Sequence, residues 1–405
     1  MNAMERLLRY VAVHTSSREG EQQTPSTEWQ FDLSHLLEQE LNDSGFEDVH
    51  VDEHAYVYGF LPATSGYEDR PCIALIAHLD TIPDEDFPGM GVRPQVVEKY
   101  DGGELVLGSS GRILSPDQFP DLKMLKGHTL ITTDGTTVLG ADDKAGIAEI
   151  LTACEEIRAA GTPHGRIAVC FPPDEEIGHG ARLLDLGRLG AEFAYTVDGG
   201  AVDEVNFETF NAAAAVVRFH GINVHPGDAK NKMRNAMHLA MEFDAMLPAA
   251  ERPERTENRE GFFHLTDMKG DVEKAELRYI IRDHDAVHFE IRKGMMFQAE
   301  KHINEVYGEG AAEVVIRDQY HNMEEILRTY PQVVERADRA IRACGMEPRH
   351  VPVRGGTDGS QLSYRGLPCP NLGTGGACFH GPYEHISAEN MQIVVKILKC
   401  LLSEA

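Results

Sequence analysis

The first two hundred residues alternate short apolar runs with longer mixed stretches. Apolar runs at 72–77, 166–170 and 193–197 are each bounded by polar residues, glycine or proline, which is typical of buried strands. The stretches 27–44 and 145–160 are long enough for helices and carry apolar residues among polar ones. Strands that alternate with helices predict an α/β domain with a mostly parallel central sheet and helices on both faces.

From about residue 211 the rhythm of the chain changes. A strand (211–221), a helix (231–250), two hairpin strands (261–272 and 274–283), a helix (285–307) and a strand (311–320) follow in turn. This order, β-α-β-β-α-β, is that of a ferredoxin-like unit. The chain then returns to helix and glycine-rich loops, and it ends on a helix at 388–402. We therefore expect a discontinuous α/β domain (1–210 and 322–405) with an inserted α+β ferredoxin-like domain (211–321).

The charge balance narrows the choice of partners. The chain has 66 acidic and 38 basic residues, a formal net charge of −28, which argues against nucleic acid and anionic membranes as partners. No apolar run reaches the roughly 18 residues of a membrane helix, and the first residues lack the apolar core of a signal peptide. The seven cysteines are scattered without a CxxC pair, which favours a reducing compartment. We expect a cytoplasmic protein.

Three adjacent acids, Asp174, Glu175 and Glu176, follow the strand predicted at 166–170. Like charges held this close raise each other's pKa and destabilise the fold unless something offsets them. A bound metal ion would do so, and it would need further ligands from elsewhere in the chain.

Other strand ends supply candidate ligands. His78 and Asp80 follow an apolar run and lie two residues apart, so they point to the same face, and Asp80 could orient a metal-bound His78. Asp142 precedes a helix, Asp198 ends a strand, and His380 lies in a glycine-rich loop. Each signal alone has an ordinary alternative: His78 could be solvated, and Asp142 could be a helix cap. Ligands of open α/β sheets gather at the carboxyl ends of strands, which is where these residues are expected to meet.

Taken in order, the motifs HLDT, GADDKAG, PDEEIG, VDGG and TGGACFHG resemble those of the co-catalytic two-metal exopeptidases, a family that includes carboxypeptidase G and succinyl-diaminopimelate desuccinylase. The similarity extends over the whole chain, through EGFFHL, MKGDVEKA, YIIRD and RGGTDGSQLS, and is greatest with the tripeptide aminopeptidases of that family. The resemblance implies five metal ligands: His78 and Asp198 for one ion, Glu176 and His380 for the other, and Asp142 between both. It also implies that Asp80 orients His78 and that Glu175 is the general base.

The resemblance implies two divalent metal ions per subunit. Imidazole nitrogen and carboxylate oxygen suit zinc, and manganese or cobalt would also be accepted. Three ligand carboxylates against four positive charges leave one positive charge for a bridging hydroxide. Cys378 lies two residues before His380 and could add a thiolate, but the family pattern requires none, which favours a structural cysteine.

The implied reaction is hydrolysis of the N-terminal peptide bond of a tripeptide by water held between the metals and deprotonated by Glu175. The inserted domain is implied to be a lid and to form a homodimer. Four substrate-binding candidates follow from the resemblance: His225, Asn235, Arg282 and Arg354. The arginines would clamp a substrate carboxylate, since their planar fork suits bidentate binding. Arg282 could instead form a salt bridge within the lid, and His225 could be a surface histidine.

Other functions remain open on the same fold. A dipeptidase, a carboxypeptidase or an N-acyl amino acid deacylase would use the same metal centre on a different substrate. An inactive scaffolding relative would lack ligands, whereas all five positions carry them here. A phosphate-binding enzyme is disfavoured, because no GxxxxGK loop follows a strand.

Overall fold

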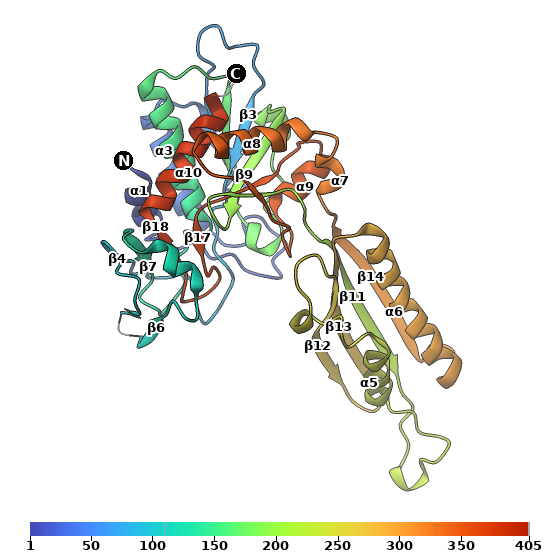
Figure 1. Cartoon of the computed structure of the whole chain (residues 1–405). Helices are drawn as coiled ribbons and strands as arrows, with labels where there is room; N and C mark the ends of the chain where they lie inside the picture. Colours follow the sequence, from blue (N-terminus) through green and yellow to red (C-terminus); the bar gives the residue numbers. More distant parts are fainter. Residues whose placement is uncertain (109, 404–405) are drawn as a thin grey trace. The chain divides into compact units, whose positions relative to one another are not determined.

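An eight-stranded sheet organises the larger of the two units that the chain forms. The computed structural model describes residues 1–108 and 110–403 (Figure 1). The first unit contains Met1–Phe207, Glu325–Val351 and the chain from Thr357 onward, and the second contains Glu208–Glu324 and Pro352–Gly356. Among the residues described, no helix has the length and apolar character needed to cross a membrane.

The central sheet is mixed: its four middle strands are parallel, and an antiparallel pairing flanks them on each side. Its strands, in spatial order, are β1 (Glu47–Val51), β2 (Val57–Leu61), β8 (Ile167–Phe171), β3 (Ile73–Ile76), β9 (Phe193–Gly199), β16 (Asn371–Gly373), β10 (Glu204–Asn206) and β15 (Arg349–His350). The four strands β8, β3, β9 and β16 run parallel, with Leu75 opposite Val169 on one side and Tyr195 on the other. The predicted fold class is therefore confirmed.

Helices cover both faces of this sheet because its strands are apolar on both sides. One face packs on α1 (Ala3–Tyr10), α3 (Ala141–Ala160), α8 (Pro331–Ala343) and α10 (Ala388–Ser403), which share one core (Figure 1). The opposite face packs on α4 (Leu186–Leu189) and α9 (Asp358–Tyr364). Helix α2 (Gln30–Asp43) shares the first core and packs on β1 and β2. Neighbouring residues of one strand serve different cores: Val57 belongs to the first and Tyr58 to the second.

A smaller sheet joins the segment 95–132 to the C-terminal part of the chain. Its order is β17 (Gly376–Ala377), β18 (His385–Ser387), β7 (Leu130–Thr132) and β4 (Gln95–Val97). The hairpin β5 (Leu105–Leu107) and β6 (Arg112–Leu114) and the 3₁₀ turn η1 (Pro120–Leu125) lie in the same segment. The loop between β17 and β18 carries His380, so this sheet anchors one of the predicted ligands.

The second unit is a four-stranded antiparallel sheet with two helices. Its strand order is β12 (Phe262–Gly270), β13 (Lys274–Asp283), β11 (Asn211–His220) and β14 (Ala312–Tyr320), and α5 (Ala236–Met246) and α6 (Ala286–Tyr307) share its core. The chain order is the predicted β-α-β-β-α-β. The helix expected from residue 231 begins at Ala236, because the side chain of Asn235 accepts a hydrogen bond from the Met237 amide and caps it.

The remaining elements are short. They are α7 (Glu324–Leu327) and the 3₁₀ turns η2 (Glu175–Ile177), η3 (Pro226–Asp228) and η4 (Pro253–Arg255).

A buried arginine ties three helices of the first unit together. Arg6 on α1 is 1% exposed, and its Nε donates to Glu40 Oε1 on α2 at 2.7 Å. Its Nη1 donates to Thr152 on α3 at 2.9 Å, and its Nη2 donates to Glu155 on the same helix. Glu40 is also buried and binds Arg9, which is 43% exposed, through its second oxygen at 3.1 Å. Arg6 is therefore the buried partner that neutralises the Glu40 carboxylate, and Arg9 is its exposed partner.

We expect Arg6→Ala to lower the free energy of unfolding by about 3–5 kcal/mol, because it leaves Glu40 buried beside a single exposed partner. Arg9→Ala is the matched control and should cost less than about 1 kcal/mol, since exposed ion pairs contribute little. Urea unfolding followed by the fluorescence of Trp29, the only tryptophan, reports on this unit. Equal losses in both variants would contradict the central role given to Arg6.

Candidate metal centre

The central strands deliver the predicted ligands to one edge of the sheet. His78 and Asp80 follow β3, Glu175 and Glu176 follow β8, and Asp198 lies near the end of β9. Because these three strands are parallel neighbours, their carboxyl ends lie together. The expectation that the strand ends meet is fulfilled for these residues.

Asp142 lies between two histidines. Its Oδ1 is 3.0 Å from His78 Nε2, and its Oδ2 is 2.9 Å from His380 Nε2. Asp142 and Asp143 have non-helical backbone angles within the span of α3, so the regular helix begins only after them. The two oxygens of one carboxylate thus face two separate imidazoles, an arrangement that suits a carboxylate shared by two metal ions.

The other predicted ligands complete two groups around Asp142. His78 Nε2 lies 3.6 Å from Asp198 Oδ1, and His380 Nε2 lies 3.2 Å from Glu176 Oε2. Ligand atoms of His78, Glu175 and Asp198 lie within 4.8 Å of one another, and so do those of His78, Asp142 and Glu176. The structure thus brings together all five predicted ligands and Glu175.

The electrostatics of this cluster fit a bound cation. Burial raises the pKa of Glu176 to about 7 and the pKa of Asp198 to about 6, and it raises the pKa of Glu175 well above its ordinary value. Glu176 Oε1 and Asp143 Oδ1 are buried and have no hydrogen-bond partner in the described structure. Divalent cations would offset the cost of burying these carboxylates and would give the two unpartnered oxygens a partner. A donor set of imidazole nitrogen and carboxylate oxygen suits zinc.

Asp80 connects His78 to the two glutamates. His78 Nδ1 lies 3.0 Å from the backbone oxygen of Asp80 and 3.4 Å from its Oδ1. The Asp80 carboxylate also accepts the amides of Glu175 at 2.9 Å and Glu176 at 3.2 Å. Since both atoms facing Nδ1 are acceptors, Nδ1 carries a proton. This leaves Nε2, which lies 3.0 Å from Asp142 Oδ1, as the nitrogen that a metal ion would take. One aspartate therefore orients both the histidine and the glutamates.

The first of the three adjacent acids has a different task. Asp174 is buried with a left-handed backbone (φ 59°), and it accepts hydrogen bonds from the Ser26 amide, the Ser26 hydroxyl and Gln30 Nε2 at 2.6–2.7 Å. It ties the turn that carries Glu175 and Glu176 to the N-terminal segment. The sequence pattern did not separate this anchor from its two neighbours.

Glu384 is a supporting residue that the sequence pattern did not reveal. It is 1% exposed, and its Oε2 accepts the amides of Leu139 and Gly140 at 2.7 and 2.8 Å. Its Oε1 accepts the amide of Asp142 at 2.9 Å. The carboxylate thus fixes the backbone that carries Asp142, and it does so from a position four residues after His380. A local sequence pattern cannot predict a contact between residues 242 positions apart.

We expect Glu384→Gln to weaken the binding of divalent metal ions by about 10–100-fold, the usual effect of losing a partner behind a metal ligand. Glutamine keeps one acceptor oxygen and places an NH₂ donor against a backbone amide. Competition with a chromophoric chelator measures the affinity.

The matched control is Glu389→Gln. Glu389 also accepts a backbone amide, that of Thr129 at 2.8 Å, but its side chain is half-exposed. The Glu389→Gln variant should bind the metal with the affinity of the wild type. An unchanged affinity in Glu384→Gln would remove Glu384 from the support of Asp142.

The two predicted arginine clamps lie in the second unit. Arg354 Nη1 donates to the backbone oxygens of Asn258 and Glu260, and its Nη2 donates to the Thr256 hydroxyl. Arg282 Nη1 donates to the backbone oxygens of Ala213 and Ile281, and its guanidinium lies 5.5 Å from the ring centre of Tyr320. No ion pair of Arg282 occurs among the described residues, so the lid salt bridge considered from sequence is not formed.

The other two substrate-binding candidates also lie in the second unit. His225 is exposed, and its Nδ1 accepts the Gly227 amide at 3.1 Å. Asn235 caps α5 through its side-chain oxygen. Their roles towards a substrate stay predictions.

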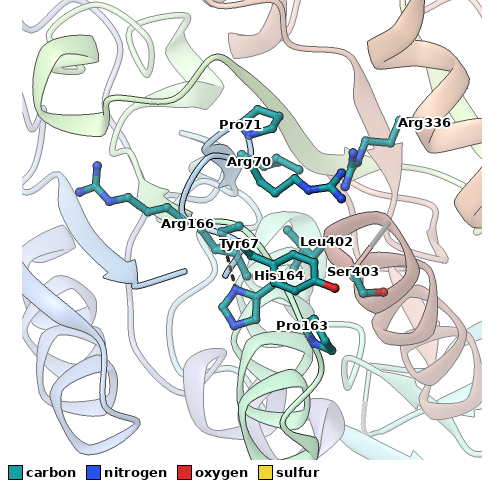
Figure 2. Close-up of a pocket in the computed structure, with 12 residues that line it drawn as sticks. Tyr67, Arg70, Pro71, Pro163, His164, Arg166, Arg336, Leu402 and Ser403 are labelled. Atoms are coloured by element: carbon teal, nitrogen blue, oxygen red, sulfur yellow. Dashed lines mark hydrogen bonds between the residues drawn. The ribbon is translucent and has the colours of Figure 1, made fainter. Parts of the chain in front are cut away.

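A separate cavity of about 110 Å³ lies at the amino ends of β3 and β8 (Figure 2). Arg70, His164 and Arg336 line it, together with Tyr67 and Leu402. None of the predicted metal ligands lines this cavity, so it is distinct from the metal centre.

The chain is similar to known peptidases over its full length. Residues 137–404 match peptidase family M20/M25/M40. Peptidase T of Exiguobacterium sp. is 50% identical over 408 residues, covering 99% of this chain and 98% of that protein. Aminopeptidase PepT from Bacillus cereus has a similar structure, with a TM-score of 0.79, 23% identity and coverage of 100% and 98%. The YXEP protein of Bacillus subtilis, a dinuclear metal binding peptidase, gives a TM-score of 0.64 at 15% identity, with coverage of 99% and 98%. The two structural likenesses show the fold.

Proposed function

The chain belongs to peptidase family M20/M25/M40 and within it to the peptidase T group, and from this premise we propose that it removes the N-terminal residue of tripeptides at a two-metal centre. The observation that carries the proposal is the position of Asp142, whose two carboxylate oxygens face His78 and His380 separately. A single-metal site would not need a carboxylate shared in this way.

Two sets of residues would hold the ions. His78 and Asp198 would bind one and Glu176 and His380 the other, with Asp142 shared by both. Zinc is the proposed metal, since imidazole and carboxylate ligands suit it. When bound, divalent ions lower the pKa of water and polarise a carbonyl group.

Glu175 would move the proton. Its amide is held by Asp80, and burial raises the pKa of its carboxyl group, which favours a base that can also act as an acid near neutral pH. One carboxylate oxygen of Glu175 accepts a proton from the attacking water. The same group then delivers that proton to the nitrogen of the leaving peptide.

Residues of the second unit would recognise the substrate. Arg282 is the stronger candidate for a carboxylate clamp, because Arg354 already donates three hydrogen bonds to the segment 256–260. The hydrogen bonds of Arg282 in the described structure use its Nη1, which leaves the Nη2 and Nε edge for a carboxylate. His225 would support the oxygen of the scissile carbonyl, and Asn235 would assist while it caps α5.

We also propose a cytoplasmic homodimer. All seven cysteines are free, as a reducing compartment would keep them. Helix α6 exposes Val287, Ile291 and Phe297, and association through the second unit would cover apolar surface of this kind. A molar mass measured by light scattering would decide the oligomeric state.

The decisive variant is Glu175→Gln, tested with a free tripeptide beside a dipeptide, a tetrapeptide and an N-acyl amino acid. We expect the wild type to release the N-terminal residue fastest from the tripeptide, and only with metal bound. Glu175→Gln should lower kcat by about 10²–10⁴-fold, the usual range for losing a general base, with metal content unchanged.

Glu47→Gln, at an exposed position on β1, is the control and should keep full activity. Metal-dependent activity on the dipeptide, or only on the N-acyl amino acid, would support the proposed metal centre but reject the tripeptide as the substrate. Full activity in Glu175→Gln would reject the proton-transfer role.

A further inference from the structure

A second group of potential ligands lies outside the five residues described above. It consists of Asp121, Cys378 and His385, whose ligand atoms lie within 4.8 Å of one another. The three come from separate segments: Asp121 from η1, Cys378 from the loop after β17, and His385 from β18. They offer an oxygen, a sulfur and a nitrogen, so the group differs in chemistry from the main centre.

His385 is held in the orientation of a metal ligand. It is fully buried, and its Nδ1 lies 2.9 Å from the backbone oxygen of Tyr383. Since a backbone oxygen only accepts, Nδ1 carries the proton and Nε2 points to Asp121 Oδ2 at 2.7 Å. His78 has the same arrangement in the main centre, with Nδ1 against the backbone oxygen of Asp80 and Nε2 towards a carboxylate.

The surroundings of this group favour positive charge. Burial by itself would lower the pKa of His385, but hydrogen bonding to Asp121 and Cys378 raises it to about 9. The same hydrogen bond lowers the pKa of Asp121 below its ordinary value. A proton shared between His385 and Asp121 meets this demand, and a cation held by all three side chains would take the place of that proton.

The backbone directs Cys378 towards His385. Ala377 pairs with His385 across the β17–β18 hairpin, and Cys378 follows with a left-handed backbone (φ 58°). Residues other than glycine adopt this region at a cost, so a local constraint must hold Cys378 there. Asp121 is 43% exposed at its side chain, so water can reach the group.

We infer that Asp121, Cys378 and His385 bind a third metal ion, zinc, apart from the two-metal centre. Three protein ligands with one position left for water is a common zinc arrangement, and a thiolate disfavours magnesium, calcium and manganese. The Nε2–Oδ2 separation of 2.7 Å would lengthen to about 3.3 Å around a tetrahedral zinc ion. This is a small movement for a half-exposed aspartate.

The ion would cross-link η1 to the hairpin that carries His380. Cys378 and His380 flank Phe379 in that hairpin, so the cross-link would restrain the loop on which one main-centre ligand depends. The role is structural, and it does not rest on the peptidase activity proposed above.

The test uses the full-length, metal-free, reduced protein titrated with Co²⁺ and followed by absorption. Cobalt bound to a thiolate gives a charge-transfer band in the near ultraviolet, whereas the main centre offers only nitrogen and oxygen. We expect three cobalt ions per chain, with the band developing for one of them and disappearing when zinc is added. Two ions per chain without the band would overturn the inference, and His385 and Asp121 would then be a hydrogen-bonded pair only.

Variants identify the ligands. Cys378→Ser and His385→Gln should each bind two cobalt ions and lose the band, and Asp121→Asn should weaken the third ion at least about tenfold. Cys344→Ser, at a half-buried cysteine after α8, is the matched control and should keep all three ions. A band lost in Cys378→Ser but retained in both His385→Gln and Asp121→Asn would assign the thiolate to another site and overturn the inference. If His385→Gln fails to fold, Asp121→Asn still tests the site, because a change at a half-exposed side chain should leave the fold intact. All these readouts are independent of peptide hydrolysis.

Discussion

The Asp142 carboxylate, held between His78 and His380, is the contact on which the arrangement of the first unit depends. Its two oxygens must face different partners, so its backbone must be fixed from more than one side. Asp142 has non-helical backbone angles at the start of α3, and Glu384 holds the same stretch by three amide hydrogen bonds. Burial of several acids at one edge of a sheet is costly without a cation, so this geometry is maintained against an electrostatic penalty.

Acids outside the predicted ligand set anchor the segments that carry the predicted ligands. Asp80 holds the amides of Glu175 and Glu176, Asp174 holds the N-terminal segment, and Glu384 holds the start of α3. A carboxylate that accepts two or three backbone amides fixes a loop more strongly than neutral acceptors can. The excess of acids in this chain is therefore partly structural at the metal centre, in addition to the acids on its surface.

The sequence predicted elements where periodicity and length were clear. The strand expected at 72–77 is β3 (Ile73–Ile76), and the strand expected at 166–170 is β8 (Ile167–Phe171). The small sheet formed by β4, β7, β17 and β18 was not predicted, because strands of two or three residues have no measurable period. The segment Pro352–Gly356 belongs to the second unit, which no local pattern indicates.

The proposed ligands could be predicted from sequence because they lie at strand ends, at a helix start or in a glycine-rich loop, within motifs that resemble those of a known family. The supporting contacts were not accessible. The hydrogen bond between Arg6 and Glu155 joins positions 149 residues apart, and the one between Glu384 and Asp142 joins positions 242 residues apart. The local sequence around these residues does not indicate either contact. Such contacts are decided by tertiary structure alone.

The β17–β18 hairpin concentrates several of these long-range contacts in twelve residues. His380 faces Asp142, Glu384 fixes the backbone of Asp142, and His385 binds Asp121. Both partners, Asp142 and Asp121, lie more than 200 residues earlier in the chain. The first unit therefore cannot bring the proposed metal ligands together until its C-terminal segment has folded back. Ligands from distant segments make metal binding and folding one coupled equilibrium, because the site does not exist in the unfolded chain. Contacts of such large sequence separation also form late and slowly. A change that loosens this hairpin should therefore reduce metal affinity and stability together, even where it touches no ligand.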